Sequence, residues 1–349
     1  MNSEIKYSDF EIVPIMKSVR KEEIDDATYF SKSYSKYISN SRLKWISDEG
    51  SPELYKNPPR IVSQALSTGS AVHEVLLQND EFELAPNLGK PTAKLGAVVE
   101  EIYNLRQKGC KLHDAIYQAC NKISYYVNSI DKKIPFIIEK GLKYYLSRLE
   151  FDKKTHVKEQ IHLSEPDYKT VSGCIESCRS NRTIMSKLHP TDVFGDPIQS
   201  FNEDALFIDF LVTYKGRCVT LPFKLKADNW TIDFDEKVVT LNDLKTSGHF
   251  VSGFMDKGHS FENFCYARQM GCYASILWYY CQRKFGVNKN TGWKLKANML
   301  VVQTIPPYTS MCFSVSNSQL KQGLNEFERL MKRVAYYENF GYKKEVKFI

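Results

Sequence analysis

The sequence predicts an α+β fold (mixed α/β), in which a central mixed sheet is flanked by helices and preceded by a helical N-terminal part. Two observations predict it. Up to about residue 190, apolar residues recur mainly every three to four positions, which is the period of a helix. From about residue 198 the period changes to two, which is the period of a strand, and a helix, a strand and a last helix follow. These elements fit a layered domain.

Several helices are expected before the sheet. One of them has a face formed by Val62, Leu66, Gly69, His73 and Leu76. Because this face is otherwise apolar or glycine, the His73 imidazole is expected to point towards the interior. Further helical spacing covers residues 97–105, 112–126, 134–149 and 173–188, and a strand-like run covers residues 156–165.

Strand patterns dominate from residue 198 onwards. Five consecutive candidates read IQSFNE, ALFIDFLVTY, RCVTLPFKLKAD, NWTIDF and KVVTLNDLKT. Turn-forming residues at 214–216 and 235–236 would join neighbouring candidates as hairpins. A long helix over about 262–283, a strand over 295–304 and a last helix over about 317–337 complete the pattern.

The chain is expected to form one large domain behind a short arm. Residues 1–34 are charged and weakly patterned, so they are predicted to form the arm. Residues 35–349 are predicted to form a single domain, with a helical part over 35–190 and the sheet with its flanking helices over 191–349.

The composition is that of an ordinary folded protein, since 42% of the 349 residues are hydrophobic and 26% are charged. The formal net charge of +7 permits a polyanionic partner without requiring one. No apolar run approaches the roughly 20 residues of a membrane helix. The N-terminal sequence MNSEIKYSDFEIV lacks the basic and apolar regions of a signal peptide. A cytoplasmic protein without a membrane partner is therefore expected.

Nine cysteines are spread from Cys110 to Cys312. Without a secretion signal, a disulfide framework is not expected. No C-x-x-C pair occurs, and Cys174 and Cys178 have the spacing of one helix face, where buried thiols are common. An iron–sulfur cluster or a structural zinc ion is not expected, because such sites usually have closely spaced cysteines.

Acidic residues stand near the ends of two strand candidates. In KVVTLNDLKT, alternation of side chains puts Val239, Leu241, Asp243 and Lys245 on one face. In RCVTLPFKLKAD, the same alternation gives a polar face that ends in Asp228. The segment between the two acids is short enough to fold back, which would bring Asp228 next to Asp243. One explanation of this pattern is an ion pair at the solvated tip of a hairpin.

Two neighbouring carboxylates also suit a metal ion. They repel each other, and one of them loses its charge unless a cation lies between them. Mg²⁺ prefers carboxylate and water ligands, and it would polarise a phosphodiester and help to generate hydroxide. Lys245 would orient the attacking water or stabilise the charge of the phosphorane. Lys224 and Lys226, which precede Asp228 on the polar face, would meet DNA phosphates.

Two further elements carry polar side chains that extend this pattern. Gln269 and Tyr273 in YARQMGCY are four residues apart and share a helix face. They form either the polar stripe of an amphipathic helix or a part of the site. His73 is either a hydrogen-bonded core residue or a metal ligand.

Seven segments carry a family resemblance in their order along the chain: ISNSRLKWI, SPELYKNPP, ALSTGSAVHEVLLQNDEF, GCIESCRSNRTI, FKLKADNW, VVTLNDLKTSGHF and YARQMGCYASIL. With them the sequence resembles the RecE-type exonucleases (exodeoxyribonuclease VIII) and their phage relatives, within the RecB-like PD-(D/E)xK nucleases. The resemblance covers about residues 35–340 and implies a restriction-endonuclease-like core.

The resemblance implies a role for each matching residue of the sheet and the helix after it. Asp228 and Asp243 match the two acidic metal ligands, which also count among the catalytic residues. Lys245 matches the catalytic lysine, and Gln269 and Tyr273 match the Q-x-x-x-Y pattern that closes the site.

Other positions match the family less closely. His73 matches the helix histidine beside the metal, and Glu203 in SFNED matches the acidic residue that opens the core, although Asp204 is adjacent. Lys226 stands where the family commonly has an arginine. The resemblance assigns no role to three residues between 248 and 262, namely His249, Asp256 and His259.

The resemblance implies a Mg²⁺-dependent deoxyribonuclease, with Mn²⁺ able to substitute, that degrades double-stranded DNA from its ends for recombination or repair. It also implies a single-strand annealing protein as a partner, a homo-oligomeric ring, and the host cytoplasm as the location if a phage encodes the chain. An endonuclease or single-strand nuclease on the same fold is an alternative, and so is a catalytically silent DNA-binding module.

Residues 29–46 form either a packed arm with a solvated face or an arm that contacts DNA. Ser39 or Ser41 would cap a short helix in this segment.

Overall fold

The computed structural model describes residues 4–59, 64–342 and 346–349. The chain forms two compact units, one comprising Met1–Val62, Cys178–Gln303 and Thr309–Ile349 and the other Ser63–Ser177 and Thr304–Tyr308. Each unit has its own buried hydrophobic core. Within the described ranges, no helix is both long enough and apolar enough to cross a membrane.

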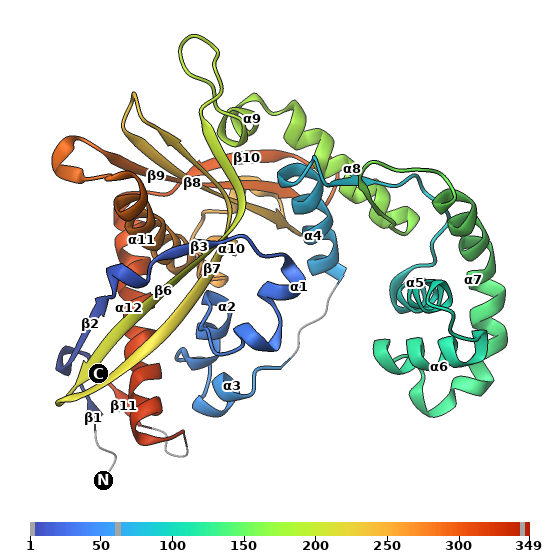
Figure 1. The fold of residues 1–349 in the computed structure, drawn as a ribbon, viewed down its shortest axis with the longest axis horizontal. Helices are drawn as coiled ribbons and strands as arrows, with labels where there is room; N and C mark the ends of the chain where they lie inside the picture. Colours follow the sequence, from blue (N-terminus) through green and yellow to red (C-terminus); the bar gives the residue numbers. More distant parts are fainter. Residues whose placement is uncertain (1–3, 60–63, 343–345) are drawn as a thin grey trace. The chain divides into compact units, whose positions relative to one another are not determined.

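A seven-stranded mixed sheet forms the centre of the first unit (Figure 1). Its strands follow one another in space as β10 (Ser310–Ser314), β9 (Lys294–Gln303), β8 (Val238–Ser247), β7 (Arg217–Asp233), β6 (Gln199–Tyr214) and β2 (Phe10–Pro14), and β3 (Arg20–Glu22) also pairs with β6. The β8–β9 pair is parallel, and the other neighbouring strands of this sheet are antiparallel. The predicted α+β class with a central mixed sheet is therefore confirmed.

The predicted strands between residues 198 and 245 merge into fewer and longer ones. β6 and β7 are 16 and 17 residues long, and each contains two of the predicted strands. The predicted break after Glu203 is wrong because pairing resumes in the same register, with Asn202 opposite Asn229 and Asp204 opposite Ala227. Glu203 has a φ of 55°, so one position of the ladder is left out without ending the strand.

The first 34 residues, which the sequence predicts as an arm, contribute to this sheet. β2 and β3 pair with different parts of β6 at the edge of the sheet. Helix α1 (Asp26–Tyr29) follows, and Tyr29 packs with Ala205 and Phe207 of β6. Short edge strands are exposed on one side, which explains why their sequence shows little hydrophobic alternation.

Two long helices, α11 (Tyr266–Phe285) and α12 (Asn317–Phe340), pack against each other and against one face of the sheet (Figure 1). The last helix predicted over about 317–337 is confirmed as α12, and its Phe327, Met331 and Val334 side chains are buried. The predicted start of α11 at residue 262 is wrong. Cys265 has a φ of 53° and separates the short helix α10 (Ser260–Asn263) from α11.

Short elements complete the first unit. The helices are α2 (Asn40–Leu43), α3 (Pro52–Lys56) and α9 (Arg182–Leu188), and β1 (Glu4–Ile5) pairs with β11 (Lys347–Phe348). Single 3₁₀ turns cover Tyr7–Asp9, Met16–Ser18, Lys32–Tyr34, Lys44–Ile46, Val251–Gly253 and Lys289–Thr291. The predicted cap of α2 is Ser39, whose hydroxyl accepts a hydrogen bond from the Arg42 backbone N–H at 3.4 Å.

The second unit is mainly helical. Its helices are α4 (Gln64–Leu77), α5 (Ala93–Gln107), α6 (Leu112–Ile123), α7 (Ile130–Asp152) and most of α8 (Glu165–Ser180), and a 3₁₀ turn covers Val127–Ser129. β4 (Phe82–Leu84) and β5 (Glu159–Ile161) form a small parallel pair. The helices predicted over 97–105, 112–126 and 134–149 are confirmed as α5, α6 and α7. Val62, predicted on the first helix, lies outside the described residues.

The helix predicted over residues 173–188 is two helices. Asn181 lies between α8 and α9, and its side-chain oxygen accepts hydrogen bonds from the backbone N–H groups of Thr183 and Ile184 at 3.1 and 3.3 Å. This side chain caps α9 and thereby starts a new helix within a continuous apolar pattern.

Helices α11 and α12 approach each other closely at two glycines. A Cβ atom at Gly323 would lie 1.7 Å from the carbonyl oxygen of Ala267, and one at Gly271 would lie 2.4 Å from that of Leu320. We expect Gly323→Ala to lower the free energy of unfolding by about 1–3 kcal/mol, because the obstacle is backbone and the helices must move apart. Urea denaturation would measure this.

Gly248→Ala is the matched control for Gly323→Ala. A Cβ atom at Gly248 has no neighbour within 4 Å, and the φ of this residue is not positive. The control is expected to leave the urea midpoint within experimental error. Equal midpoints for the two variants would contradict the close packing of α11 on α12.

Candidate active site

The sheet divides where β7 and β8 separate. The two strands pair from Asp233 and Val238 up to Asn229 and Asn242, and their pairing ends there. Beyond this point β7 continues beside β6 and β8 continues beside β9. We call this point the fork. The next residues are Asp228 on β7 and Asp243 on β8, so the hairpin brings the two acids together as expected from strand alternation.

Lys245 lies between the two acids of the fork. Its ammonium nitrogen is 2.6 Å from Asp243 Oδ2 and 3.6 Å from Asp228 Oδ2. Asp228 Oδ2 also accepts a hydrogen bond from the backbone N–H of Leu244 at 2.8 Å. The side chain of Asp228 thus takes the place of a backbone acceptor of β7 where β7 and β8 separate. This hydrogen bond fixes the orientation of the Asp228 carboxylate.

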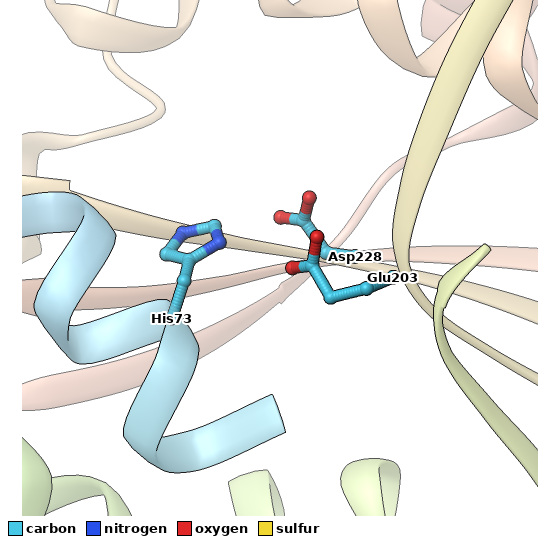
Figure 2. Close-up of side chains that lie close together, drawn as sticks. All are labelled: His73, Glu203 and Asp228. Carbon is cyan, nitrogen blue, oxygen red and sulfur yellow. The ribbon is translucent and has the colours of Figure 1, made fainter. Parts of the chain in front are cut away.

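Glu203 adds a further carboxylate. In the register of β6 and β7 it stands opposite Asp228. The pairing of the two strands is interrupted at this one position, where Glu203 has a positive φ. Ligand atoms of the two side chains lie within 4.8 Å of each other, and Figure 2 shows their carboxylates side by side. Like charges directly opposite on neighbouring strands repel. The pair is therefore compatible with a divalent metal ion, which carboxylate oxygens bind well.

The structure distinguishes Glu203 from its acidic neighbour. Asp204 Oδ2 accepts a hydrogen bond from the indole N–H of Trp230 at 2.9 Å, and Asp204 Oδ1 is 2.7 Å from the ammonium of Lys21. Asp204 is therefore engaged in the packing of the sheet, whereas Glu203 is the acid beside Asp228.

Gln269 contacts the fork from helix α11. Its amide Nε2 donates a hydrogen bond to Asp243 Oδ1 at 2.7 Å. Tyr273 lies one helical turn further on, and burial raises the pKa of its hydroxyl well above the ordinary value, with smaller contributions from nearby groups that include Asp243 and Asp228. This hydroxyl therefore stays protonated at neutral pH and keeps its donor hydrogen.

Sequence reasoning missed Tyr266 of the same helix. The ammonium of Lys245 is 5.7 Å from the centroid of the Tyr266 ring. Burial raises the pKa of Tyr266, against the opposing effect of Lys245. Tyr266 stands three residues before Gln269, so continuing the polar stripe towards the start of the helix would have found it.

The two acids keep Lys245 charged. Burial by itself lowers the pKa of this ammonium, but the negative charges of Asp243 and Asp228 outweigh burial and raise the pKa above its ordinary value. Lys245 therefore carries a positive charge throughout the neutral pH range. In this state it is a cation and a hydrogen-bond donor.

The two lysines predicted to meet DNA phosphates have partners inside the chain. Lys224 is 7% exposed, donates a hydrogen bond to the Tyr29 carbonyl and lies 4.1 Å from the centroid of the Tyr29 ring. Lys226 forms ion pairs with Asp26 and, at 2.7 Å, with Glu203. The burial of Lys224 argues against a direct phosphate contact, which needs an accessible ammonium.

The remaining predicted residues lie on other elements. His73 is a partly buried residue of α4, in the second unit, and Figure 2 draws its side chain. His249, Asp256 and His259 lie between β8 and α10. The backbone N–H of His259 donates a hydrogen bond to the Asp256 carbonyl at 3.1 Å, and His259 is the residue before α10. These backbone contacts indicate no catalytic or metal-binding role for the three residues.

No protein-family model matches the chain, and no curated protein matches it at a significant level. Among solved structures, the chain is similar to a "Putative exonuclease" from Eubacterium rectale. The two share 15% sequence identity with a TM-score of 0.46, and the match covers 92% of this chain and 88% of that chain.

Proposed function

We propose that this chain is a divalent-metal-dependent deoxyribonuclease that hydrolyses phosphodiester bonds of double-stranded DNA from an end. One observation carries the proposal: Asp228, Asp243 and Lys245 meet at the fork, with Glu203 opposite Asp228. Several acids grouped beside one lysine are better explained by metal-dependent phosphodiester hydrolysis than by a structural ion pair. A structural ion pair needs only one acid. The preference for duplex ends rests on the resemblance to the RecE-type family.

The metal ion would be Mg²⁺, with Mn²⁺ able to replace it. Asp228, Asp243 and Glu203 are the side chains that would hold it, because carboxylate oxygens suit Mg²⁺ and Mn²⁺. His73 is included as a further ligand on the family resemblance alone. When bound, the ion would supply Lewis-acid activation of the phosphodiester and would lower the pKa of a water nucleophile.

The other side chains would orient the reacting groups. Lys245, held as a cation by two carboxylates, would orient the attacking water and compensate negative charge that develops on the phosphate. Asp243 is held from two sides, by Lys245 and by the amide of Gln269, so its oxygen atoms keep one orientation. The neutral hydroxyl of Tyr273 would donate a hydrogen bond at the edge of the site.

Purified protein, incubated with linear and with closed circular duplex DNA, tests the activity and its mode. We expect Mg²⁺ or Mn²⁺ to support loss of the linear duplex, EDTA to stop it, and closed circles to persist. Degradation of closed circles would indicate an endonuclease. A substrate preference for single strands would indicate a single-strand nuclease, and no cleavage with either ion would favour a silent DNA-binding module.

We further infer the context from the family resemblance. The products would be single strands that a single-strand annealing protein receives during recombination or repair, and the chain would act as a homo-oligomeric ring in the cytoplasm of a phage host. The mass of the purified protein in solution, with and without a duplex end, tests the ring. A monomer under both conditions would contradict it.

A further inference from the structure

A row of buried amide side chains crosses the sheet beside the candidate active site. Asn229 on β7, Asn242 on β8 and Asn298 on β9 are 0%, 0% and 3% exposed. Asn242 Nδ2 donates a hydrogen bond to Asn229 Oδ1 at 2.7 Å, and Asn298 Nδ2 donates to Asn242 Oδ1 at 2.9 Å. We call these three residues the amide ladder.

Both ends of the amide ladder are also hydrogen-bonded. On β6, Asn202 Oδ1 and Ser200 Oγ accept from Asn229 Nδ2 at 2.7 and 2.9 Å. On β10, Ser314 Oγ donates to Asn298 Oδ1 at 3.3 Å. Asn242 Nδ2 donates a second bond to the Lys187 carbonyl of α9 at 3.0 Å. Side chains therefore link five neighbouring strands.

Such a row is unusual inside a sheet. Asparagine is depleted in strands, and a buried amide is tolerated only when its donors and acceptors are paired. Apolar side chains of similar volume would fill the same space without that requirement. The hydrogen bonds of the amide ladder therefore point to a role other than filling the core.

The position of the amide ladder indicates this role. Asn229 and Asn242 form the last paired position before β7 and β8 separate. Each of them is the direct chain neighbour of an acid of the fork, Asp228 or Asp243. A shift of one residue in strand pairing would turn these carboxylates to the opposite faces of the sheet. Cross-strand amide bonds at this position oppose such a shift on both sides of β8.

We propose that Asn229, Asn242 and Asn298 are positioning residues that hold the carboxylates of Asp228 and Asp243 in the geometry that binds the divalent metal ion. They touch neither the metal nor the substrate, and they act by fixing where the strands separate. The inference rests on the proposed function, because it assumes a metal ion at the fork.

Replacement of the whole amide ladder by leucine, Asn229→Leu/Asn242→Leu/Asn298→Leu, tests the proposal. Leucine has a similar shape, and the outer side-chain partners Ser200, Asn202 and Ser314 are exposed, so water can replace the amide bonds that they lose. The Lys187 carbonyl, on a half-buried residue, also loses its amide donor. We expect a folded protein whose dissociation constant for Mn²⁺, measured by calorimetry without DNA, rises about 10–100-fold, as for other residues that orient metal ligands.

Two further variants separate positioning from stability. Asn298→Leu, at the far end of the amide ladder, keeps Asn229 and Asn242 and is expected to weaken Mn²⁺ binding about 10-fold, at the lower end of that range. Val334→Ala removes buried volume from α12 and is expected to lower the melting temperature with unchanged Mn²⁺ affinity.

Wild-type affinity for Mn²⁺ in the triple variant would overturn the proposal. If the triple variant does not fold, wild-type affinity in Asn298→Leu would overturn it instead. A weakened affinity in Val334→Ala equal to that in Asn298→Leu would also overturn it, because general destabilisation would then explain both. No Mn²⁺ binding by the wild-type protein would refute the proposed function itself.

Discussion

Asp243→Asn is expected to slow cleavage of linear duplex DNA by about 10²–10³-fold, the usual effect of removing one group that stabilises a reacting charge. Asp243 is 1% exposed, and its Oδ2 lies 2.6 Å from the ammonium of Lys245. Its Oδ1 accepts a hydrogen bond from the side-chain amide of Gln269. Asparagine keeps the shape of this side chain but removes the negative charge. A metal ion at the fork would lose one carboxylate ligand, and the fold would remain.

Initial rates with excess Mg²⁺ and the melting temperature, measured on the same sample, test this expectation. Asp204→Asn is the matched control, because Asp204 is also a buried acid with an ion pair and a hydrogen bond. It lies outside the proposed chemistry, so it should lower stability while leaving cleavage per folded molecule near the wild-type rate. Normal cleavage by Asp243→Asn would mean that the fork is not the active site.

The central part of the candidate site could be predicted because it depends on local alternation. Side chains two residues apart share a face of a strand, so Asp243 and Lys245 had to lie together. The short hairpin then had to bring Asp228 to the same end of β8. The distances from Lys245 to these two acids agree with this expectation. The catalytic and metal-binding roles of these residues stay predictions.

The contribution of Glu203 could not be obtained from alternation. Its positive φ interrupts the period of two within a continuous strand, so the pattern does not show which side chain faces β7. Sequence matching gave Glu203, with Asp204 adjacent to it. The hydrogen bond from Trp230 engages Asp204 in the packing of the sheet, and because this contact joins different strands, the pattern along one strand does not show it. The metal-binding role of Glu203 stays a prediction.

Contacts between distant segments explain the remaining differences. Lys224 is buried because Tyr29, which is 195 positions earlier in the chain, covers it. The residues before position 34 show no strong pattern, so nothing in the sequence predicted that they cover the polar face of β7. The role of His73 likewise stays a prediction, because it rests on the family resemblance.

Lys245→Met is expected to give the second large effect, and it should separate binding from chemistry. Cleavage should fall by about 10²–10³-fold, because a cation that compensates charge on the phosphate is lost. The affinity for Mn²⁺ should not fall, in contrast to Asp243→Asn, because the carboxylates of Asp228 and Asp243 lose a competing positive charge. Lys21→Met removes the comparable ion pair of Asp204 outside the site and should leave cleavage unchanged.

The stability of Lys245→Met should depend on the metal ion. Without the ammonium, the buried carboxylate of Asp243 loses its 2.6 Å ion pair, and removal of one member of a buried pair costs about 3–5 kcal/mol. A divalent ion that binds only the folded state restores stability in proportion to its occupancy. Mn²⁺ should therefore raise the melting temperature of Lys245→Met more than that of the wild-type protein. An equal rise of the melting temperature in both proteins would mean that Mn²⁺ binds away from Asp243. Lys245 would then serve only the stability of the sheet at the fork.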